Sequence, residues 1–268
     1  MRLSEEEIQQ GAMSAENLAL ALRTLRDVGY VALEDVVPLD WVERAHKACD
    51  AELERYVAEG EGGEHLTKRW GHVSMLSPMV SPFTDPECVE NPFALQVMEA
   101  AMGKDIYCAF YNTNTAWPGS THQPLHRDIQ HLFPECPYPL PVSMVVVNFP
   151  LVDFNEANGS TEVYPGTHLV TDTDPEDKQK LLERAALLPS ARTNVTAGSL
   201  IVRDMRMWHR GMPNPSQTVR TMLAIVYSRG FWITDPRMNQ IPRSTWEQMS
   251  EKTKHLFRHN PVVDDAPV

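Results

Sequence analysis

The sequence has few cysteines, and none of them belongs to a paired motif. Cys49, Cys88, Cys108 and Cys136 are widely spaced and form no CxxC pair. This spacing argues against a zinc knuckle and against a dense disulfide framework. We therefore expect reduced thiols in an intracellular protein.

Long apolar runs are also missing. No stretch approaches the roughly 20 apolar residues that a membrane-spanning helix needs. The first ten residues, MRLSEEEIQQ, are polar and acidic, whereas a signal peptide has a basic start and then an apolar run. These features predict a cytoplasmic protein that has no membrane partner.

Basic residues are scarce relative to acidic ones, at 24 Lys and Arg against 36 Asp and Glu, which gives a formal charge of -12. An acidic surface repels polyanions, so a nucleic-acid partner is not expected. The same charge weakly disfavours coenzyme A thioesters, although a local basic pocket would still accept their phosphates. A small-molecule substrate fits best, and a homodimer remains open.

The overall composition is that of an ordinary globular protein, with 42% hydrophobic and 22% charged residues in a chain of 268. We expect one domain. Within it we predict a mainly helical part with a lid loop at residues 1–103, a β core at 104–232 and a C-terminal extension at 233–268.

Helical spacing of apolar residues is concentrated in the first third of the chain. Residues 14–28 predict a helix that begins at a Ser14 cap and is ended by Gly29. Residues 30–33 are then expected to form a short strand. Further helices are predicted at 38–58, 93–102, 174–187 and 244–257. The last of these would be capped at Ser244, with Glu247 three residues later.

Strand-like runs dominate the rest of the chain and are separated by Pro- and Gly-rich turns. They lie at residues 105–116, 142–151, 199–203 and 219–229. Several short strands with such turns indicate a sandwich or barrel. The predicted fold is mainly β with flanking α-helices around a double-stranded β-helix, the jelly-roll or cupin-like core.

A His-x-Asp motif follows the first long strand. In an extended segment, His126 and Asp128 project to the same side and can hold one ion. Pro118 and Pro124 argue against a helix here, which weakens a rival in which His122 and His126 bind zinc at i, i+4 spacing. Alone, the motif is a weak signal, because a solvated loop pair is the more common reason for such a pattern.

A third candidate ligand, His209, follows the apolar run Ser199-Leu200-Ile201-Val202. Two imidazoles and one carboxylate leave three octahedral positions open, which suits non-haem iron(II). A zinc hydrolase would accept the same ligands, so residue types alone leave the metal open. A structural histidine is the plain alternative for His209.

Arg220 lies eleven residues after His209, at the start of a largely apolar strand. A guanidinium holds a carboxylate through two parallel hydrogen bonds, and a buried arginine without an anion would be costly. Arg220 is therefore a candidate anchor for the distal carboxylate of 2-oxoglutarate.

These motifs occur in an order that resembles a known family. They are Asp27-Val28-Gly29-Tyr30-Val31, Gln123-x-x-His126-x-Asp128, Asn158-Gly159-Ser160-Thr161, Pro165-Gly166-Thr167-His168, Trp208-His209-x-Gly211 and Arg220. The chain resembles the phytanoyl-CoA dioxygenase (PhyH) family of iron(II)/2-oxoglutarate-dependent oxygenases over nearly its whole length.

The resemblance implies a ligand set. His126, Asp128 and His209 match the iron(II) ligands of the family. Arg220 matches the arginine that binds the distal carboxylate of 2-oxoglutarate. Gln123 and Thr161 match positions that contact the same cosubstrate. Halogenating relatives replace the carboxylate ligand, which Asp128 retains here. Gly211 departs from the members that carry a hydroxyl at this position.

The resemblance also implies a reaction. Oxygen and 2-oxoglutarate would be converted to succinate and carbon dioxide while a small apolar specialised metabolite is hydroxylated, desaturated, epoxidised or cyclised. An acyl-CoA hydroxylase of the same family, a zinc hydrolase and a non-catalytic or zinc-binding jelly-roll protein remain alternatives.

Several further residues are expected around the site. Loop 60–85 is the candidate lid, and Asn112 and Asn114 are expected to face the barrel interior. His168 is expected to support a turn and not to bind metal. Expected substrate contacts are Trp70, His72 and Met75, with an apolar wall of Trp117, Phe133, Phe231 and Trp232.

Overall fold

A six-stranded antiparallel sheet forms the centre of the computed structural model, which describes residues 1–58, 70–172, 178–233 and 239–265. The strand order is β1-β7-β4-β9-β3-β2. The bounds are β1 Tyr30–Leu33, β2 His72–Val73, β3 Ile106–Ala116, β4 Met144–Pro150, β7 Leu200–Asp204 and β9 Arg220–Arg229. All four long runs predicted as strands are therefore confirmed.

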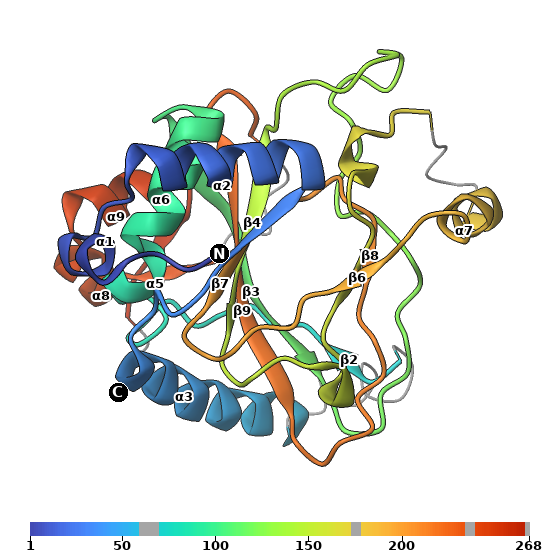
Figure 1. Cartoon of the computed structure of the whole chain (residues 1–268). Coiled ribbons are helices and arrows are strands. Elements are labelled where there is room, and N and C mark those ends of the chain that lie inside the picture. The colour runs from blue at the N-terminus through green and yellow to red at the C-terminus, as the bar shows by residue number, and fades with distance from the viewer. Residues whose placement is uncertain (59–69, 173–177, 234–238, 266–268) are drawn as a thin grey trace.

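A second, smaller sheet faces the first (Figure 1). Its order is β6-β5-β8, with bounds Ala191–Arg192, Glu162–Val163 and His209–Arg210. An isolated bridge between His126 and His209 adds the His-x-Asp segment to its edge. Two facing antiparallel sheets with helices outside are the architecture that the strand pattern predicts.

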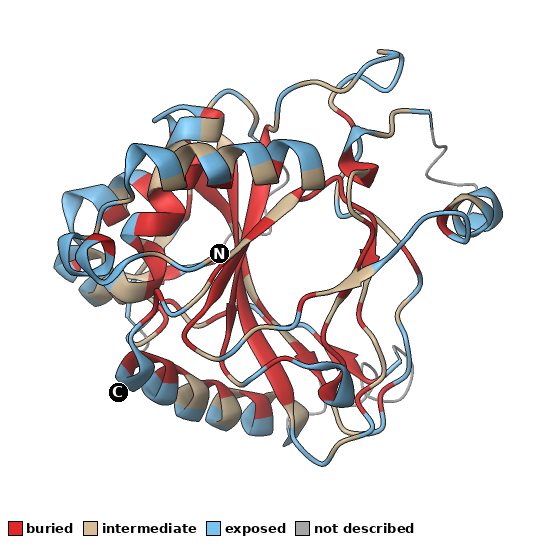
Figure 2. Ribbon diagram, viewed as in Figure 1, coloured by how far each residue is buried: buried red, intermediate tan, exposed pale blue. Residues whose placement is uncertain are grey.

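Helices cover the face of the large sheet that points away from the small one, and most of them have buried residues on their inner side (Figures 1 and 2). The helices on this side are α1 Glu5–Gln10, α2 Ala15–Val28, α3 Leu39–Ala58, α5 Pro86–Val89, α6 Pro92–Met102, α8 Arg243–Gln248 and α9 Glu251–Leu256. The 3₁₀ turns η1 Glu156–Asn158 and η2 Thr167–Leu169, helix α7 Lys178–Ala185, and the strand pair β10 Ile241–Pro242 and β11 Val262–Val263 complete the elements.

Strand alternation divides the large sheet into a core face and a cavity face. On β9, Leu223, Ile225 and Tyr227 belong to the main hydrophobic core under the helices. The intervening Ala224 and Val226 line the cavity between the sheets. Successive side chains of a strand point to opposite faces, so one strand supports the core and also shapes the cavity.

The N-terminal helices follow their sequence signals. The Ser14 side chain accepts a hydrogen bond from the Asn17 amide, and α2 ends where Gly29 adopts a φ of 97°. The helices predicted at residues 38–58 and 93–102 are confirmed as α3 and α6.

The C-terminal helix predicted at residues 244–257 is helical over most of this range but is not continuous. It is two short helices, because Met249 is extended and Ser250 begins α9 by accepting from the Thr253 amide. Ser244 caps nothing, since its hydroxyl donates to Asp265 at 2.8 Å. Of the helix predicted at 174–187, α7 covers Lys178–Ala185, and residues 174–177 lie outside the described residues.

The described part of the predicted lid is attached to the sheet. Residues 60–69 lie outside the described residues, but β2 pairs with β3 through His72 and Ala116. Met75 is buried in the main core, and Trp70 is 47% exposed. None of Trp70, His72 and Met75 lines the cavity between the sheets, so their prediction as substrate contacts is wrong.

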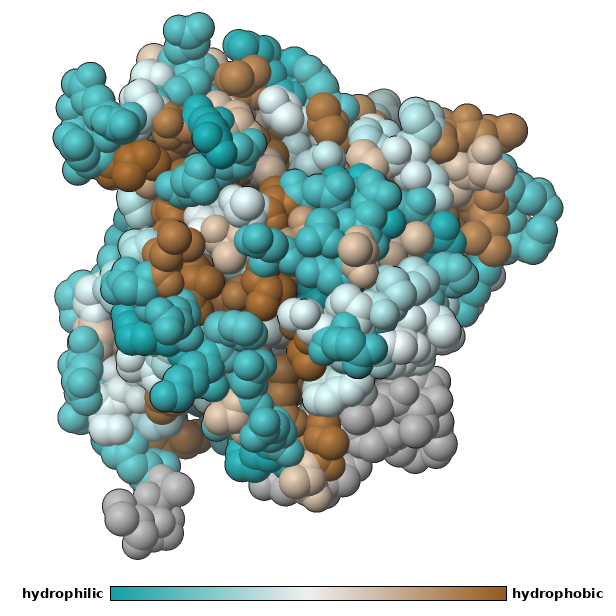
Figure 3. All heavy atoms as spheres, turned by 60° about the horizontal axis from the view of Figure 1, so that its bottom comes forward, coloured by the Kyte–Doolittle hydropathy of each residue, from teal (hydrophilic) through white to brown (hydrophobic). Residues whose placement is uncertain are grey.

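On the face shown in Figure 3, hydrophilic side chains cover most of the surface and apolar ones form small groups between them. Among the described residues, no helix combines the length and the apolar character needed to cross a membrane.

Candidate active site between the two sheets

A cavity of about 140 Å³ lies between the two sheets. Its lining is divided by polarity. Phe110, Val146, Met205 and Val226 provide apolar surface, while polar side chains line the rest: Asn112, Asn114, Gln123, Asn148, Thr161, Thr193 and Arg220. Asn112 and Asn114 thus lie where strand alternation predicted them.

The three predicted metal ligands meet at this cavity. The backbones of His126 and His209 hydrogen-bond to each other at 3.1 and 2.9 Å, which fixes the loop against β8. Asp128 Oδ1 is 3.6 Å from the Nε2 atom of each histidine. One ligand atom from each residue lies within 4.8 Å of the others, a spacing that fits a single ion.

Backbone carbonyls orient both imidazoles. His126 Nδ1 lies 2.8 Å from the Pro124 carbonyl, and His209 Nδ1 lies 3.0 Å from the Met207 carbonyl. A carbonyl only accepts, so each Nδ1 carries the proton and each Nε2 keeps its lone pair for a metal.

The electrostatics prepare two of these ligands, Asp128 and His209, for a cation. Burial opposes ionisation of Asp128, but nearby positive charge, including that of Arg203, holds its pKa well below the usual range. Burial, and then Arg203, lowers the pKa of His209 to about 3. An ionised carboxylate and a neutral imidazole are the forms that bind metal, so no proton must leave either group near neutral pH.

Access to the three ligands comes from one side. The exposed fractions of the side chains are 9% for His209, 24% for Asp128 and 39% for His126. The site therefore opens to solvent beside His126.

Arg220 is buried at the start of β9 and is only 1% exposed. Its Nε and Nη1 atoms have no hydrogen-bond partner among the described residues, and its guanidinium lies 4.7 Å from the centre of the Phe154 ring. Burial, and then Arg192, lowers the pKa of Arg220 to about 10. A charged group buried with unused donors is costly unless an anion binds it.

Gln123 and Thr161 also line the cavity. The Gln123 side-chain oxygen accepts from the Gly211 amide at 2.9 Å, which fixes the orientation of its side-chain amide. His168 lies away from the triad, and its Nε2 is 2.9 Å from the Arg26 carbonyl, in keeping with a supporting role at a turn.

The predicted aromatic wall does not line the cavity. Phe133 and Phe231 are 51% and 69% exposed, and Trp117 is not among the lining residues. Trp232 packs against the apolar cluster that includes Val146, Met205 and Val226, but it is not itself among the lining residues. This prediction is wrong because aromatic type alone does not reveal side-chain direction in loops.

Sequence reasoning missed Arg203, Asn148 and Thr193, which all line the cavity. For Asn148 a signal was present, since it interrupts the otherwise apolar strand β4. Arg203 is two residues from Ile201 on β7, so strand alternation places both side chains on the cavity face.

Comparisons with known proteins agree with this geometry. The family model described as "Phytanoyl-CoA dioxygenase (PhyH)" matches residues 25–222. An iron/alpha-ketoglutarate-dependent dioxygenase, ausO, of Aspergillus calidoustus is 26% identical over 77% of this chain and 71% of its own length. A dioxygenase, aneA, of Aspergillus aculeatus is 25% identical over 96% of this chain and 87% of its own.

Solved structures share the fold. The non-heme alpha ketoglutarate dependent carbocyclase SnoK from nogalamycin biosynthesis superposes with a TM-score of 0.58 at 19% identity, covering 81% of this chain and 84% of that one. EctD from S. alaskensis with bound Fe superposes with a TM-score of 0.56 at 19% identity, covering 81% and 76%. The chain therefore belongs to the phytanoyl-CoA dioxygenase (PhyH) family of iron(II)/2-oxoglutarate-dependent dioxygenases.

Proposed function

We propose that His126, Asp128 and His209 hold iron(II), that Arg220 binds the distal carboxylate of 2-oxoglutarate, and that Gln123 and Thr161 contact the same cosubstrate. The observation that carries this proposal is the pair of unpartnered donors on Arg220, which is buried in the cavity of the triad. A zinc hydrolase has no need for a buried cation without a partner at this place.

Dioxygen is the oxidant, and bound iron(II) would couple its four-electron reduction to the conversion of 2-oxoglutarate to succinate and carbon dioxide and to the two-electron oxidation of the substrate. The chain supplies positioning. The backbone of Arg220 pairs with Ala116 and its guanidinium lies beside the Phe154 ring, where it would fix one end of the cosubstrate. The buried sheet faces around it limit access of water.

We propose a small, apolar specialised metabolite as the substrate, oxidised by hydroxylation, desaturation, epoxidation or cyclisation. Support comes from the apolar part of the cavity, where Val146, Met205 and Val226 belong to one buried cluster. Apolar side chains gathered on one part of a cavity favour an apolar group of the ligand there. The nogalamycin-biosynthesis carbocyclase with the same fold is in keeping with this class.

We also propose that the enzyme acts in the cytoplasm, on a small molecule, without a nucleic-acid or membrane partner. All four cysteines are free, and the formal charge is -12. A homodimer would be compatible with this function.

The test uses the full chain loaded with iron(II) under anaerobic conditions. Adding 2-oxoglutarate should produce a metal-to-ligand charge-transfer band in the visible spectrum, and admitting oxygen should then release succinate. Arg220→Lys should raise the 2-oxoglutarate concentration for half-saturation by at least about tenfold, because an ammonium cannot replace two parallel hydrogen bonds.

Arg229→Lys is the matched control. Arg229 lies at the other end of β9, and its guanidinium donates to the carbonyls of Val142 and Ala101, away from the cavity. This variant should keep the wild-type half-saturation. A wild-type protein that forms no band, or that turns over fully without oxygen, would refute the proposal.

A further inference from the structure

We propose that Arg203 is a positioning residue that holds Asp128 by one carboxylate oxygen, so that this ligand offers only its other oxygen to the metal. The inference rests on the proposed function, because it assumes that the triad binds a metal. It concerns how the ligand is held and is tested separately.

The two oxygens of Asp128 have different surroundings. Arg203 Nη2 donates to Oδ2 at 2.8 Å. Oδ1 is instead 3.6 Å from His126 Nε2 and 3.6 Å from His209 Nε2. A charge-assisted hydrogen bond of this length is among the stronger ones in proteins, so it fixes which oxygen faces the histidines.

The rigidity of the two partners differs. Arg203 is on β7, where it pairs with Tyr30 on one side and Val146 on the other, and it is 7% exposed. Asp128 belongs to no helix or strand, and its amide is held only at the Met205 carbonyl. The strand residue therefore orients the loop residue, and not the reverse.

The second arm of the guanidinium touches the other side of the site. Arg203 Nη1 is 3.2 Å from His209 Nδ1, which also faces the Met207 carbonyl. The proton on His209 Nδ1 points at the Met207 carbonyl, so Nδ1 has no lone pair to accept with. Because arginine only donates, its contact with Nδ1 is electrostatic and is not a hydrogen bond. Arg203 thus borders two of the three ligands through one fork.

The number of oxygens that Asp128 offers to the metal decides how many coordination positions remain for other ligands. Two imidazoles and one carboxylate oxygen leave three octahedral positions, of which a chelating 2-oxo acid needs two. A carboxylate that used both oxygens would remove one of these positions. Losing the Arg203 contact should therefore weaken binding of the 2-oxo acid in a protein that still folds.

The experiment replaces Arg203 in the full chain and loads the protein with cobalt(II), whose visible spectrum reports coordination number. Arg203→Met should change the cobalt(II) spectrum and weaken 2-oxoglutarate binding by roughly tenfold, as is typical when a partner of a metal ligand is lost. Arg203→Lys keeps the buried charge but has no fork, so it should give an intermediate spectrum and affinity.

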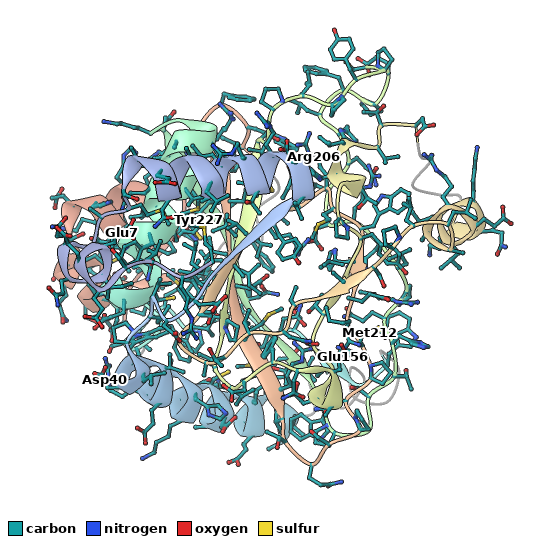
Figure 4. The ribbon with its side chains drawn as sticks, in the orientation of Figure 1. Glu7, Asp40, Glu156, Arg206, Met212 and Tyr227 are labelled. Carbon is teal, nitrogen blue, oxygen red and sulfur yellow. The ribbon has the colours of Figure 1, made fainter. Side chains whose placement is uncertain are left out.

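Arg206→Met is the control, because it also removes a buried arginine from an ion pair. Arg206 binds Asp204 at 2.6 Å and does not border the triad, and it lies near the C-terminal end of α2 (Figure 4). This variant should keep the wild-type cobalt(II) spectrum and 2-oxoglutarate affinity.

Two results would overturn the inference. One is a folded Arg203 variant, Met or Lys, whose spectrum and affinity equal those of the wild type. The other is a wild-type spectrum in Arg203→Met with an affinity that lysine restores fully, because then only charge matters. Failure of the proposed function looks different, since wild-type protein would then bind neither cobalt(II) at the triad nor 2-oxoglutarate.

Discussion

Gly211 lies directly against the imidazole of His72, and this contact explains why position 211 has no side chain. A Cβ atom on Gly211 would come within 2.5 Å of His72 Cε1 and 2.8 Å of Gln123 Oε1. His72 is anchored by β2 and by a 2.8 Å hydrogen bond between its Nε2 and the Thr121 carbonyl. The space that a hydroxyl-bearing side chain would use is therefore filled from another strand.

Gly211→Ala should destabilise the protein by about 1–3 kcal/mol, the usual cost of overpacking a filled site. Adding His72→Ala to this variant should cost less than the sum of the two single changes, because it makes room for the methyl group. Urea unfolding of the four proteins measures the coupling. Strict additivity would contradict the contact.

The pH dependence of stability should carry a contribution from His72. Burial lowers its pKa to about 4, whereas the unfolded chain has a histidine pKa near 6.5. Between these values the unfolded state binds the proton first, so the free energy of unfolding falls as the pH drops from about 6.5 to about 4.

His72→Asn should lose this acid sensitivity. Between pH 7 and 5.5 the wild type should lose about 1 kcal/mol more than the variant, measured by urea unfolding of metal-free protein. His122→Asn, at an exposed position nearby, should follow the wild type. Parallel curves for the wild type and His72→Asn would rule this contribution out.

Metal binding should depend on His209 and not on buried histidines in general. His209→Ala removes one of three ligands, so its affinity for iron(II) should fall by more than about a hundredfold, beyond the usual cost of losing an outer-shell partner. His131→Ala is the control, because His131 is 7% exposed and its Nε2 lies 2.8 Å from the Val170 carbonyl. Anaerobic equilibrium dialysis compares them, and equal losses would exclude the triad as the metal site.

Two threonines of the cavity should differ in their effect on the cosubstrate. Thr161→Val should weaken 2-oxoglutarate binding by about fivefold, which corresponds to one hydrogen bond. Thr193→Val should change it little, because the Thr193 hydroxyl already donates to the Thr161 carbonyl at 3.4 Å. Titrating the charge-transfer band tests both, and equal affinities in the two variants would argue against a Thr161 contact.

Much of the fold was predictable because its signals are local. Ser14 and Gly29 bound α2 through a cap and a left-handed turn, which depend on adjacent residues only. The C-terminal helix was mispredicted because Ser244 and Ser250 are both suitable caps, and the choice depends on distant partners. Ser244 bonds to Asp265, which no local pattern reveals.

The sequence by itself determined the chemistry available at the site. His126 and Asp128 are two residues apart in an extended segment, so their shared direction follows from strand geometry. The order of the motifs then identified His209 and Arg220 as their partners, and the structure brings all four to one cavity.

Only the tertiary structure decided how these groups are held. Arg203 meets Asp128 across 75 positions of sequence, and His72 fills the space beside Gly211 from a different strand. Neither contact has a local signal, because each depends on how the strands align across and between the two sheets. The direction of loop aromatics such as Phe133 depends on the same packing. The ordered motifs, through their family resemblance, indicated the reaction, while tertiary contacts shaped the site that would perform it.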